Sequence, residues 1–322
     1  MNEPRRPRPY SRERRSGSSP DRLPGLSQRT VFAQDPRPMA MIRKLQNYFL
    51  DAYDRQRIGI ALSRGALMKQ ARTIDLTRPF TWEFSGFSQN GEDGILDVLR
   101  SRLTSSNRYF IEIGASDGIQ NNSAWLVVAE QYDGLMIEGD PGLVERARRT
   151  VLGYSIGAEC HALFVTKGAA PSLKALAFHL DPDVFSLDID GNDLHIAEAL
   201  LGNGFRPKII AVEYNSAFGP ERSVTIEYRD DFVCTKAHPT HLYYGVSVTG
   251  WRNFFGRHGY SFVTVDRNGV NAFFADRACF DPAFLNGIRP LDFAENRYQL
   301  LKFRKPHDQQ FDLIADGRLV TI

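Results

Sequence analysis

Cysteine is scarce in this sequence of 322 residues. The chain holds three cysteines, Cys160, Cys234 and Cys279, which are odd in number and far apart. This spacing excludes a disulfide framework and a close-spaced zinc motif, and it suits a reducing compartment. The sequence also lacks any run of 18 uninterrupted apolar residues, so we expect no membrane-spanning helix. Together these absences predict a cytoplasmic protein.

A large excess of one charge is also missing, because the net charge of the whole chain is only +2. That charge is unevenly distributed. Residues 1–30 hold eight arginines and three acids, a local excess that is larger than the excess of the whole chain. The remainder is therefore slightly acidic, which argues against a nucleic-acid-binding core. Hydrophobic content of 42% and charged content of 24% are ordinary for a globular protein.

The first 80 residues divide into two segments. Residues 1–38 are rich in Pro, Arg and Ser and have almost no apolar periodicity, so we expect a disordered basic tail. They are either a solvated tail or a segment upstream of a true start at Met39 or Met41. Residues 39–79 have a helical apolar pattern. This helical segment packs either on the core or on a partner subunit, which would make the protein a homo-oligomer.

One stretch in the first half of the chain has the pattern of a nucleotide-binding unit. Residues 109–113 (YFIEI) form a short apolar and β-branched run, which predicts a buried strand. Gly114 and Gly118 then bracket a turn in which side chains would block a close backbone approach. An apolar helical pattern follows, and a second strand at 134–137 ends on Glu138. Strand, glycine turn, helix, strand and acid form a βαβ unit in which the acid binds ribose hydroxyls.

Acidic side chains within this unit indicate which nucleotide it binds. A dinucleotide fingerprint reads G-x-G-x-x-G and places pyrophosphate on the helix N-terminus, whereas here carboxylates lie in the turn and at the strand. They would repel phosphate but suit a cationic ligand with an amino group and a ribose, such as S-adenosylmethionine (SAM). The candidate cofactor-binding residues are Glu112, Gly114, Ala115, Asp117, Gly118, Glu138 and Asp188.

The rest of the chain continues the alternation of strands and helices. We predict an α/β fold with a seven-stranded, Rossmann-like, mostly parallel sheet and an antiparallel C-terminal hairpin. The hairpin signal is Asn268-Gly269. This domain spans 80–280, and 281–322 form a C-terminal extension. The further predicted strands are 162–165, 183–190, 208–213, 261–265 and 271–274.

More acids follow the fourth and fifth predicted strands. Alternation along the fourth strand places Asp188 and Asp190 on one side, and Glu213 and Asn215 follow the fifth strand. Because ligands bind beyond the carboxyl ends of such strands, we expect these side chains to converge there. They form an all-oxygen set that suits a divalent cation such as Mg²⁺. Alternatively, no metal binds, and one aspartate lies near the amino group of the cofactor or caps a helix.

Candidate catalytic residues come from the same set of acids and from one histidine. Asp188, Asp190 and Glu213 are the candidate acids, and Asp190, Glu213 and Asn215 are the candidate metal ligands. His241 lies in an irregular insert that could close over the site. It is either a general base or a surface histidine.

With these residues in place, the chain resembles the FkbM-type SAM-dependent methyltransferases. The matching motifs are FIEIGASDG (110–118), GLMIE (134–138) and SLDIDGND (186–193), supported by SQNGEDG (88–94) and AVEYN (211–215). The resemblance implies O-methylation of a hydroxyl on a sugar, polysaccharide or natural product, with a small-molecule or glycan acceptor. The family motif D-x-E-G-x-E is replaced here by Asp188-Ile-Asp190-Gly191-Asn-Asp193. A non-catalytic nucleotide-binding module, or another chemistry on the same fold, remains an alternative.

Overall fold

The computed structural model describes residues 36–151 and 153–322. Residues 46–322 form one compact unit, and the residues before 46 belong to a second unit. The predicted disordered tail of residues 1–38 lies outside the described residues, apart from 36–38, which begin helix α1 (Pro36–Ala71). In the part of the chain that the structure describes, no helix combines the length and apolar character needed to cross a membrane.

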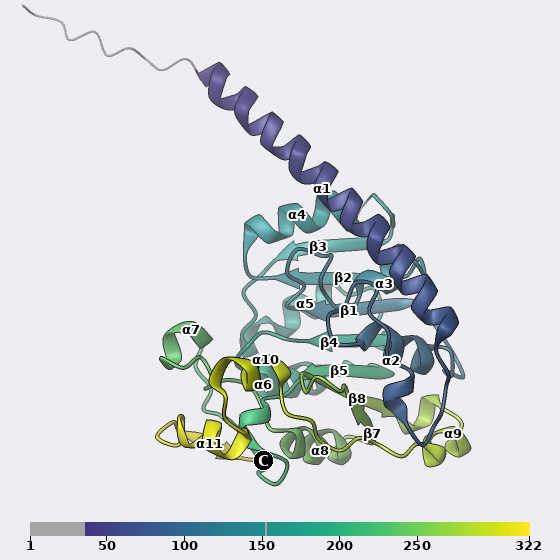
Figure 1. Cartoon of the computed structure of the whole chain (residues 1–322), viewed down its shortest axis with the longest axis vertical. Helices are drawn as coiled ribbons and strands as arrows, with labels where there is room; N and C mark the ends of the chain where they lie inside the picture. Colours follow the sequence, from purple (N-terminus) through teal and green to yellow (C-terminus); the bar gives the residue numbers. More distant parts are fainter. Residues whose placement is uncertain (1–35, 152) are drawn as a thin grey trace, which may run out of the picture. The chain divides into compact units, whose positions relative to one another are not determined.

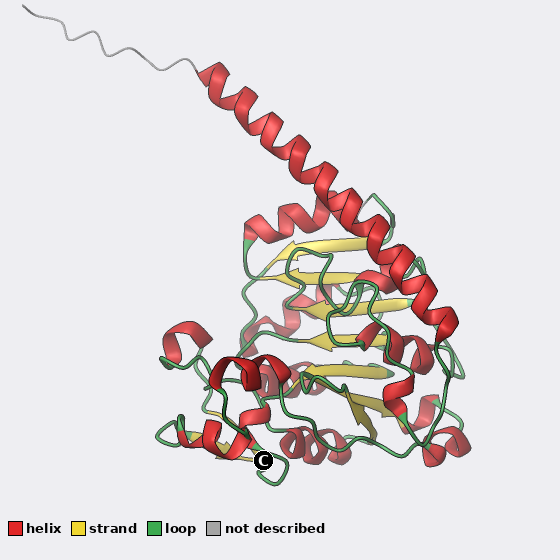
Figure 2. Ribbon diagram, viewed as in Figure 1, coloured by secondary structure: helices red, strands yellow, loops and turns green. Residues whose placement is uncertain are grey.

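A seven-stranded sheet forms the centre of the fold, in the order β3-β2-β1-β4-β5-β8-β7 (Figures 1 and 2). The strands β1 to β5 are parallel, and β8 pairs antiparallel with both β5 and β7. The predicted fold class is therefore confirmed. The strands are β1 (Tyr109–Ile113), β2 (Asp133–Glu138), β3 (Ala158–Ala162), β4 (Val184–Leu187), β5 (Ile209–Glu213), β7 (Tyr260–Val265) and β8 (Asn271–Asp276).

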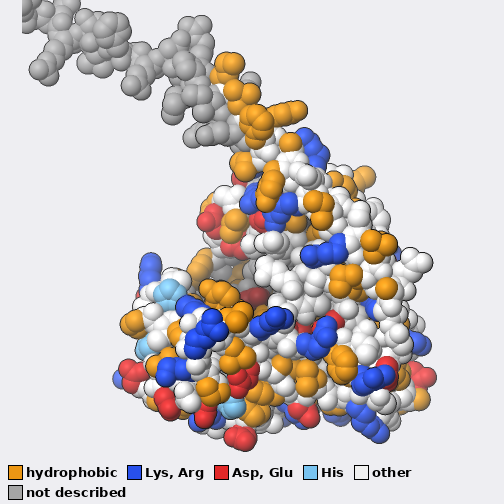
Figure 3. Space-filling model, in the orientation of Figure 1, with side chains coloured by type: hydrophobic (Ala, Val, Ile, Leu, Met, Phe, Trp, Pro, Cys, Tyr) orange, Lys and Arg blue, Asp and Glu red, His pale blue; other side chains and the backbone are white. Residues whose placement is uncertain are grey.

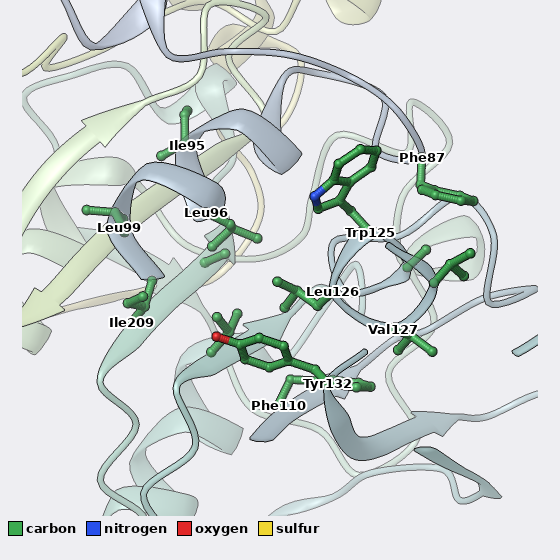
Figure 4. Close-up of a cluster of buried hydrophobic side chains, with 14 of the residues drawn as sticks. Phe87, Ile95, Leu96, Leu99, Phe110, Trp125, Leu126, Val127, Tyr132 and Ile209 are labelled. Atoms are coloured by element: carbon green, nitrogen blue, oxygen red, sulfur yellow. The ribbon is translucent and has the colours of Figure 1, made fainter. Parts of the chain in front are cut away.

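Helices cover both faces of this sheet because successive strand residues point to opposite sides. Phe110 of β1 packs into a core with α2 and α3, shown in Figure 4. Its neighbour Ile111 packs into a second core with α6 and α8. The helices after α1 are α2 (Glu92–Arg100), α3 (Ala124–Val128), α4 (Pro141–Val151), α5 (Ala170–Leu176), α6 (Asp193–Gly202), α7 (Cys234–Ala237), α8 (Val248–Arg257), α9 (Pro282–Gly287), α10 (Arg297–Phe303) and α11 (His307–Asp312).

Two strands differ from the boundaries that the sequence predicts. The third strand is β3 at Ala158–Ala162, so the prediction of 162–165 is shifted towards the C-terminus. Leu163 to Val165 follow the strand instead, and their apolar side chains line a cavity. The fourth strand ends at Leu187, before the acids that were predicted to lie within it. Apolar residues that follow a strand have the same sequence pattern as strand residues. This explains why the predicted boundaries of the third strand are wrong.

The insert between β5 and α8 is joined to the C-terminal extension by a small sheet. β6 (Val224–Ile226) of the insert pairs antiparallel with β9 (Leu319–Thr321). Residues of both strands pack into a separate hydrophobic core. This core combines Phe218 and Phe232 of the insert with Ile314 of the extension. The insert is therefore a packed structure rather than a loose loop.

The C-terminal part of α1 packs on the sheet domain, which was one of the two predicted alternatives. Ile58 and Ala61 of this helix are buried in the first core. Nearby, the buried Asp54 accepts hydrogen bonds from Arg57 (3.3 Å) and from Arg146 of α4 (2.6 Å). Burial would raise the pKa of Asp54, but the two arginines hold it below its ordinary value.

The loop before α2 is fixed by one buried carboxylate. Asp93 Oδ2 accepts backbone N–H groups from Gly86 (2.8 Å), Phe87 (2.8 Å) and Ser88 (3.0 Å). Its other oxygen, Oδ1, is buried without a hydrogen-bond partner. Burial raises the pKa of Asp93 to about 7, despite these donors.

Replacing Gly114 at the end of β1 should destabilise the fold. Gly114 has φ of +91°, and a Cβ atom there would overlap the backbone carbonyl oxygen of Asp188. We expect Gly114→Ala to cost about 3 kcal/mol or more in free energy of unfolding, from overpacking and left-handed strain together. Urea denaturation measures this loss. Gly168→Ala is the control, because a Cβ there meets only a hydroxyl at 3.7 Å, and equal stability of both variants would contradict the expectation.

The buried Asp93 should make stability depend on pH. Because its folded pKa of about 7 exceeds the unfolded value, its contribution is complete below the unfolded pKa and is lost as pH rises through 7. Asp93→Asn removes the ionisation and keeps the shape. From pH 5 to pH 8, the free energy of unfolding of the wild type should fall by about 2–3 kcal/mol relative to that of this variant. Urea denaturation at both pH values tests this, with the exposed Asp181→Asn as control, and parallel pH profiles would refute it.

Candidate functional site

A cavity of about 400 Å³ lies beyond the carboxyl ends of β1, β2 and β4. In Figure 2 this is the side to which the arrowheads of the parallel strands point, and Figure 3 shows a hollow there between the regions of α4 and α7. This is the position at which open α/β sheets bind ligands. The cavity is lined by Ile113, Gly114, Ser116, Gln120, Ile137, Glu138, Gly139, Leu163, Phe164, Val165, Asp188, Ile189, Asp190, Gly191, Asn192 and Phe232.

Glu138 lies at the end of β2, where the sequence places the ribose-binding acid. One carboxylate oxygen accepts the backbone N–H of Ser116, and the other accepts that of Asp140, each at 2.9 Å. These bonds fix the side chain between the glycine turn and the start of α4. Each oxygen keeps a second lone pair, so a ligand hydroxyl can still donate to Glu138 from within the cavity.

Glu112 organises the chain on the other side of the glycine turn. Its carboxylate accepts the backbone N–H groups of Asn122 (2.9 Å) and Ser123 (3.2 Å) and also the Ser123 hydroxyl. Burial raises the pKa of Glu112 to about 7. Glu112 does not line the main cavity, but it lines a second hollow beside it.

Three other predicted cofactor residues do not line the cavity. Ala115 is 1% exposed and donates its backbone N–H to Ile137 O at 3.1 Å. Asp117 accepts N–H groups within its own turn and pairs with Arg57 at 3.1 Å. Gly118 supplies a positive φ of +75° to the same turn. In the structure these residues shape the turn, because short polar and small side chains satisfy the local backbone.

The predicted acids from two strand ends converge. One carboxylate oxygen each from Asp188, Asp190 and Glu213 lies within 4.8 Å of the others. Glu213 is buried, Asp188 is half-buried, and Asp190 is exposed. Asp190 itself has a left-handed backbone conformation, with φ of +50°. Backbone strain of this kind is frequent at functional sites.

Burial and acidic neighbours raise the proton affinity of two of these carboxylates. Burial, followed by repulsion from Asp190 and Asp193, raises the pKa of Asp188 well above its ordinary value. Burial and repulsion from Asp188 act on Glu213 in the same direction. Among the described residues, the charged groups that shift these two pKa values are all acids. A cleft with mutually perturbed acids is a candidate functional site.

The other two predicted site residues are Asn215, whose side chain binds backbone groups, and His241 of the insert. The amide of Asn215 is buried, donates to the carbonyls of Leu242 (2.6 Å) and Tyr244 (3.0 Å), and accepts the N–H of Ala217 (3.0 Å). It therefore caps a short helical turn, and its role as a metal ligand stays a prediction. His241 is an exposed side chain on a left-handed residue of the insert and does not line the cavity.

A second hollow of about 140 Å³ adjoins the cavity through the shared residues Gly114, Gln120 and Asp188. Part of its polar lining comes from the SQNGEDG motif (88–94). Asn271 is the most informative member: its Nδ2 donates to Glu92 Oε1 at 2.9 Å, whereas its Oδ1 is buried without a partner. The further amide side chains of the hollow are Gln89, Asn90, Asn121 and Asn122.

Comparisons with known proteins give fold-level likeness only. No family model and no curated protein matches the sequence. The chain is similar to an O-methyltransferase from Bacillus cereus in complex with S-adenosylhomocysteine (SAH; 13% identity, 68% of this chain and 89% of that chain, TM-score 0.38). It is also similar to an O-methyltransferase from Streptomyces achromogenes involved in tomaymycin synthesis, in complex with SAM (18%, 66% and 94%, TM-score 0.40). These TM-scores are below 0.5, so the fold assignment rests on the strand order, and FkbM membership stays a prediction.

Proposed function

We propose that the chain is a SAM-dependent O-methyltransferase that acts on a hydroxyl of a sugar, polysaccharide or natural product. The observation that carries this proposal is the acid-lined cavity at the carboxyl ends of β1, β2 and β4, with Glu138 at its β2 side. The family resemblance of the motifs at 110–118, 134–138 and 186–193 points to the same cofactor.

The cavity fits the parts of SAM by size and chemistry. Its volume of about 400 Å³ is in the range of small-molecule sites. Glu138 is placed for the ribose hydroxyls, and the apolar Ile137, Leu163 and Phe164 beside it suit the adenine ring. Asp188 and Asp190 on the other side suit the ammonium and sulfonium charges. The same carboxylates oppose the phosphates of ATP or NAD.

The second hollow is where we place the acceptor. Its amide side chains offer both donors and acceptors, which suits a ligand with several hydroxyls. The unpartnered Oδ1 of Asn271 can accept one such hydroxyl. Because Asp188 lines both hollows, an acceptor hydroxyl beside it lies next to the cofactor site.

The reaction is an in-line displacement. The acceptor oxygen forms a bond to the methyl carbon while the carbon–sulfur bond breaks, which leaves SAH. The hydroxyl proton passes to the acid cluster of Asp188, Asp190 and Glu213. Orientation of the two ligands by the adjoining hollows supplies much of the rate, and a positioned base contributes roughly 10²–10⁴-fold.

Cofactor binding is the first test, and calorimetry measures it. SAM and SAH should bind to the full chain, whereas ATP and NAD should not. Gly139→Leu should weaken SAM binding at least tenfold, roughly 1.4 kcal/mol. Gly139 lines the cavity, and a Cβ there meets only the Phe164 ring at 3.5 Å. The side chain therefore fills the site without a backbone clash, unlike a substitution at Gly114.

Gly168→Leu is the matched control, because Gly168 is exposed and outside the cavity. It should bind SAM as wild type does. Preference for ATP or NAD over SAM would contradict the proposed cofactor. SAM binding without conversion to SAH on a panel of mono- and oligosaccharides and polyphenols would favour the non-catalytic module.

A further inference from the structure

Other buried carboxylates in the described residues either pair with basic side chains or accept backbone N–H groups, as Asp93 and Glu112 do, and one cluster is an exception. Elsewhere, Asp97 pairs with Lys69 at 2.8 Å, and Asp183 pairs with Lys208 at 2.8 Å. Asp188, Asp190 and Glu213 instead bring three oxygens within 4.8 Å of one another. In residues 36–151 and 153–322, none of these three acids forms a salt bridge with a lysine, arginine or histidine.

A buried oxygen without a partner gives an independent indication of a ligand. Glu213 is 8% exposed, and its Oε1 accepts the Tyr244 hydroxyl at 3.2 Å. Its Oε2 is buried and has no hydrogen-bond partner. An unpaired buried carboxylate oxygen is costly, so this oxygen requires either a cation or a proton shared with the adjacent Asp188 carboxyl.

The neighbouring strand presents a second oxygen of the same kind. Asn271 of β8 is the direct register partner of Glu213 of β5, and directly paired residues project to the same face of a sheet. The Oδ1 of Asn271 is also buried and unpartnered. Both atoms accept and neither donates when Glu213 is ionised. The missing partners are therefore hydrogen-bond donors or cations.

We propose that Asp188, Asp190 and Glu213 bind a hard divalent cation. Carboxylate oxygens are the ligands that Mg²⁺, Ca²⁺ and Mn²⁺ prefer. The exposed Asp190 leaves part of the coordination sphere open to water, whereas Glu213 supplies a ligand from inside. The cation would lie at the border of the two hollows, because Asp188 lines both. Its binding does not rest on the proposed function, but its use there does: a cation at this border lowers the pKa of an acceptor hydroxyl.

Calorimetry on the EDTA-treated full chain, without SAM, tests the site with the chlorides of Mg²⁺, Ca²⁺ and Mn²⁺. We expect at least one ion to bind with a Kd of ~1 mM or lower and to raise the melting temperature. Asp190→Asn and Glu213→Gln should each weaken that binding at least tenfold. Asp181→Asn removes one charge on the far side of the sheet domain, before β4, and should bind the ion as wild type does.

The outcomes separate the cation from the alternatives. If none of the three ions binds at ~10 mM, or if Asp190→Asn binds as tightly as wild type, the cation site is overturned and a shared proton neutralises the acids. Asp190 is exposed, so its variant should fold even if Glu213→Gln does not, and circular dichroism checks both. SAM binding is measured on the same samples. If SAM binds and no cation binds, the cation site alone is overturned. If a cation binds and SAM does not, the proposed function alone is overturned.

Discussion

The close approach of two backbone segments at the carboxyl ends of β1 and β4 is the constraint on which the site depends. Asp188 donates its N–H to Ile113 O at 3.0 Å, and Gly114 donates its N–H to Ile137 O at 2.9 Å. The carbonyl of Asp188 occupies the space that a side chain at position 114 would need. Because Gly114 has no side chain, the end of β4 can lie directly beside the glycine turn. Through that contact, the carboxylate of Asp188 reaches both hollows.

Among the described residues, the acids of the cluster lack the basic partners that two other buried aspartates have. Burial would raise the pKa of Asp97 and Asp183, but lysine and arginine partners lower both below the ordinary value. Asp188 and Glu213 have no such basic partner among the causes of their pKa shifts, and their acidic neighbours raise both pKa values further. Other buried acids, such as Asp93 and Glu112, accept backbone N–H groups. Asp188 and Glu213 have neither kind of partner among the described residues, which leaves them for a ligand, a proton or an ion.

The sequence predicts the sheet and the convergence of the acids because both follow from strand periodicity. Parallel strands end on one edge, so Glu138, Asp188 and Glu213 must lie on the same side of the molecule. Sequence patterns do not reveal whether a short polar side chain turns towards a ligand or towards its own backbone. Asp117 and Asn215 both bind the local backbone, a contact that the sequence alone does not distinguish from a site role.

Other site residues depend on contacts between distant parts of the chain. Asn271 reaches Glu213 only through the antiparallel register of β5 and β8. Phe232 reaches the cavity from an insert with little regular structure. Neither residue lies in a motif, so local patterns give no signal for them.

The pairing of β6 with β9 has a consequence for how the protein matures on the ribosome. The insert that carries Phe232 to the cavity is held by a strand, Leu319–Thr321, that is synthesised almost 90 residues later. Contacts of such long sequence separation form late. The nascent chain can assemble β1, β2 and β4 while translation continues, but the wall formed by the insert must wait for the last strand. This wall of the cavity is therefore completed late in folding, and a chain that stops before residue 319 would lack the strand pairing that holds the insert.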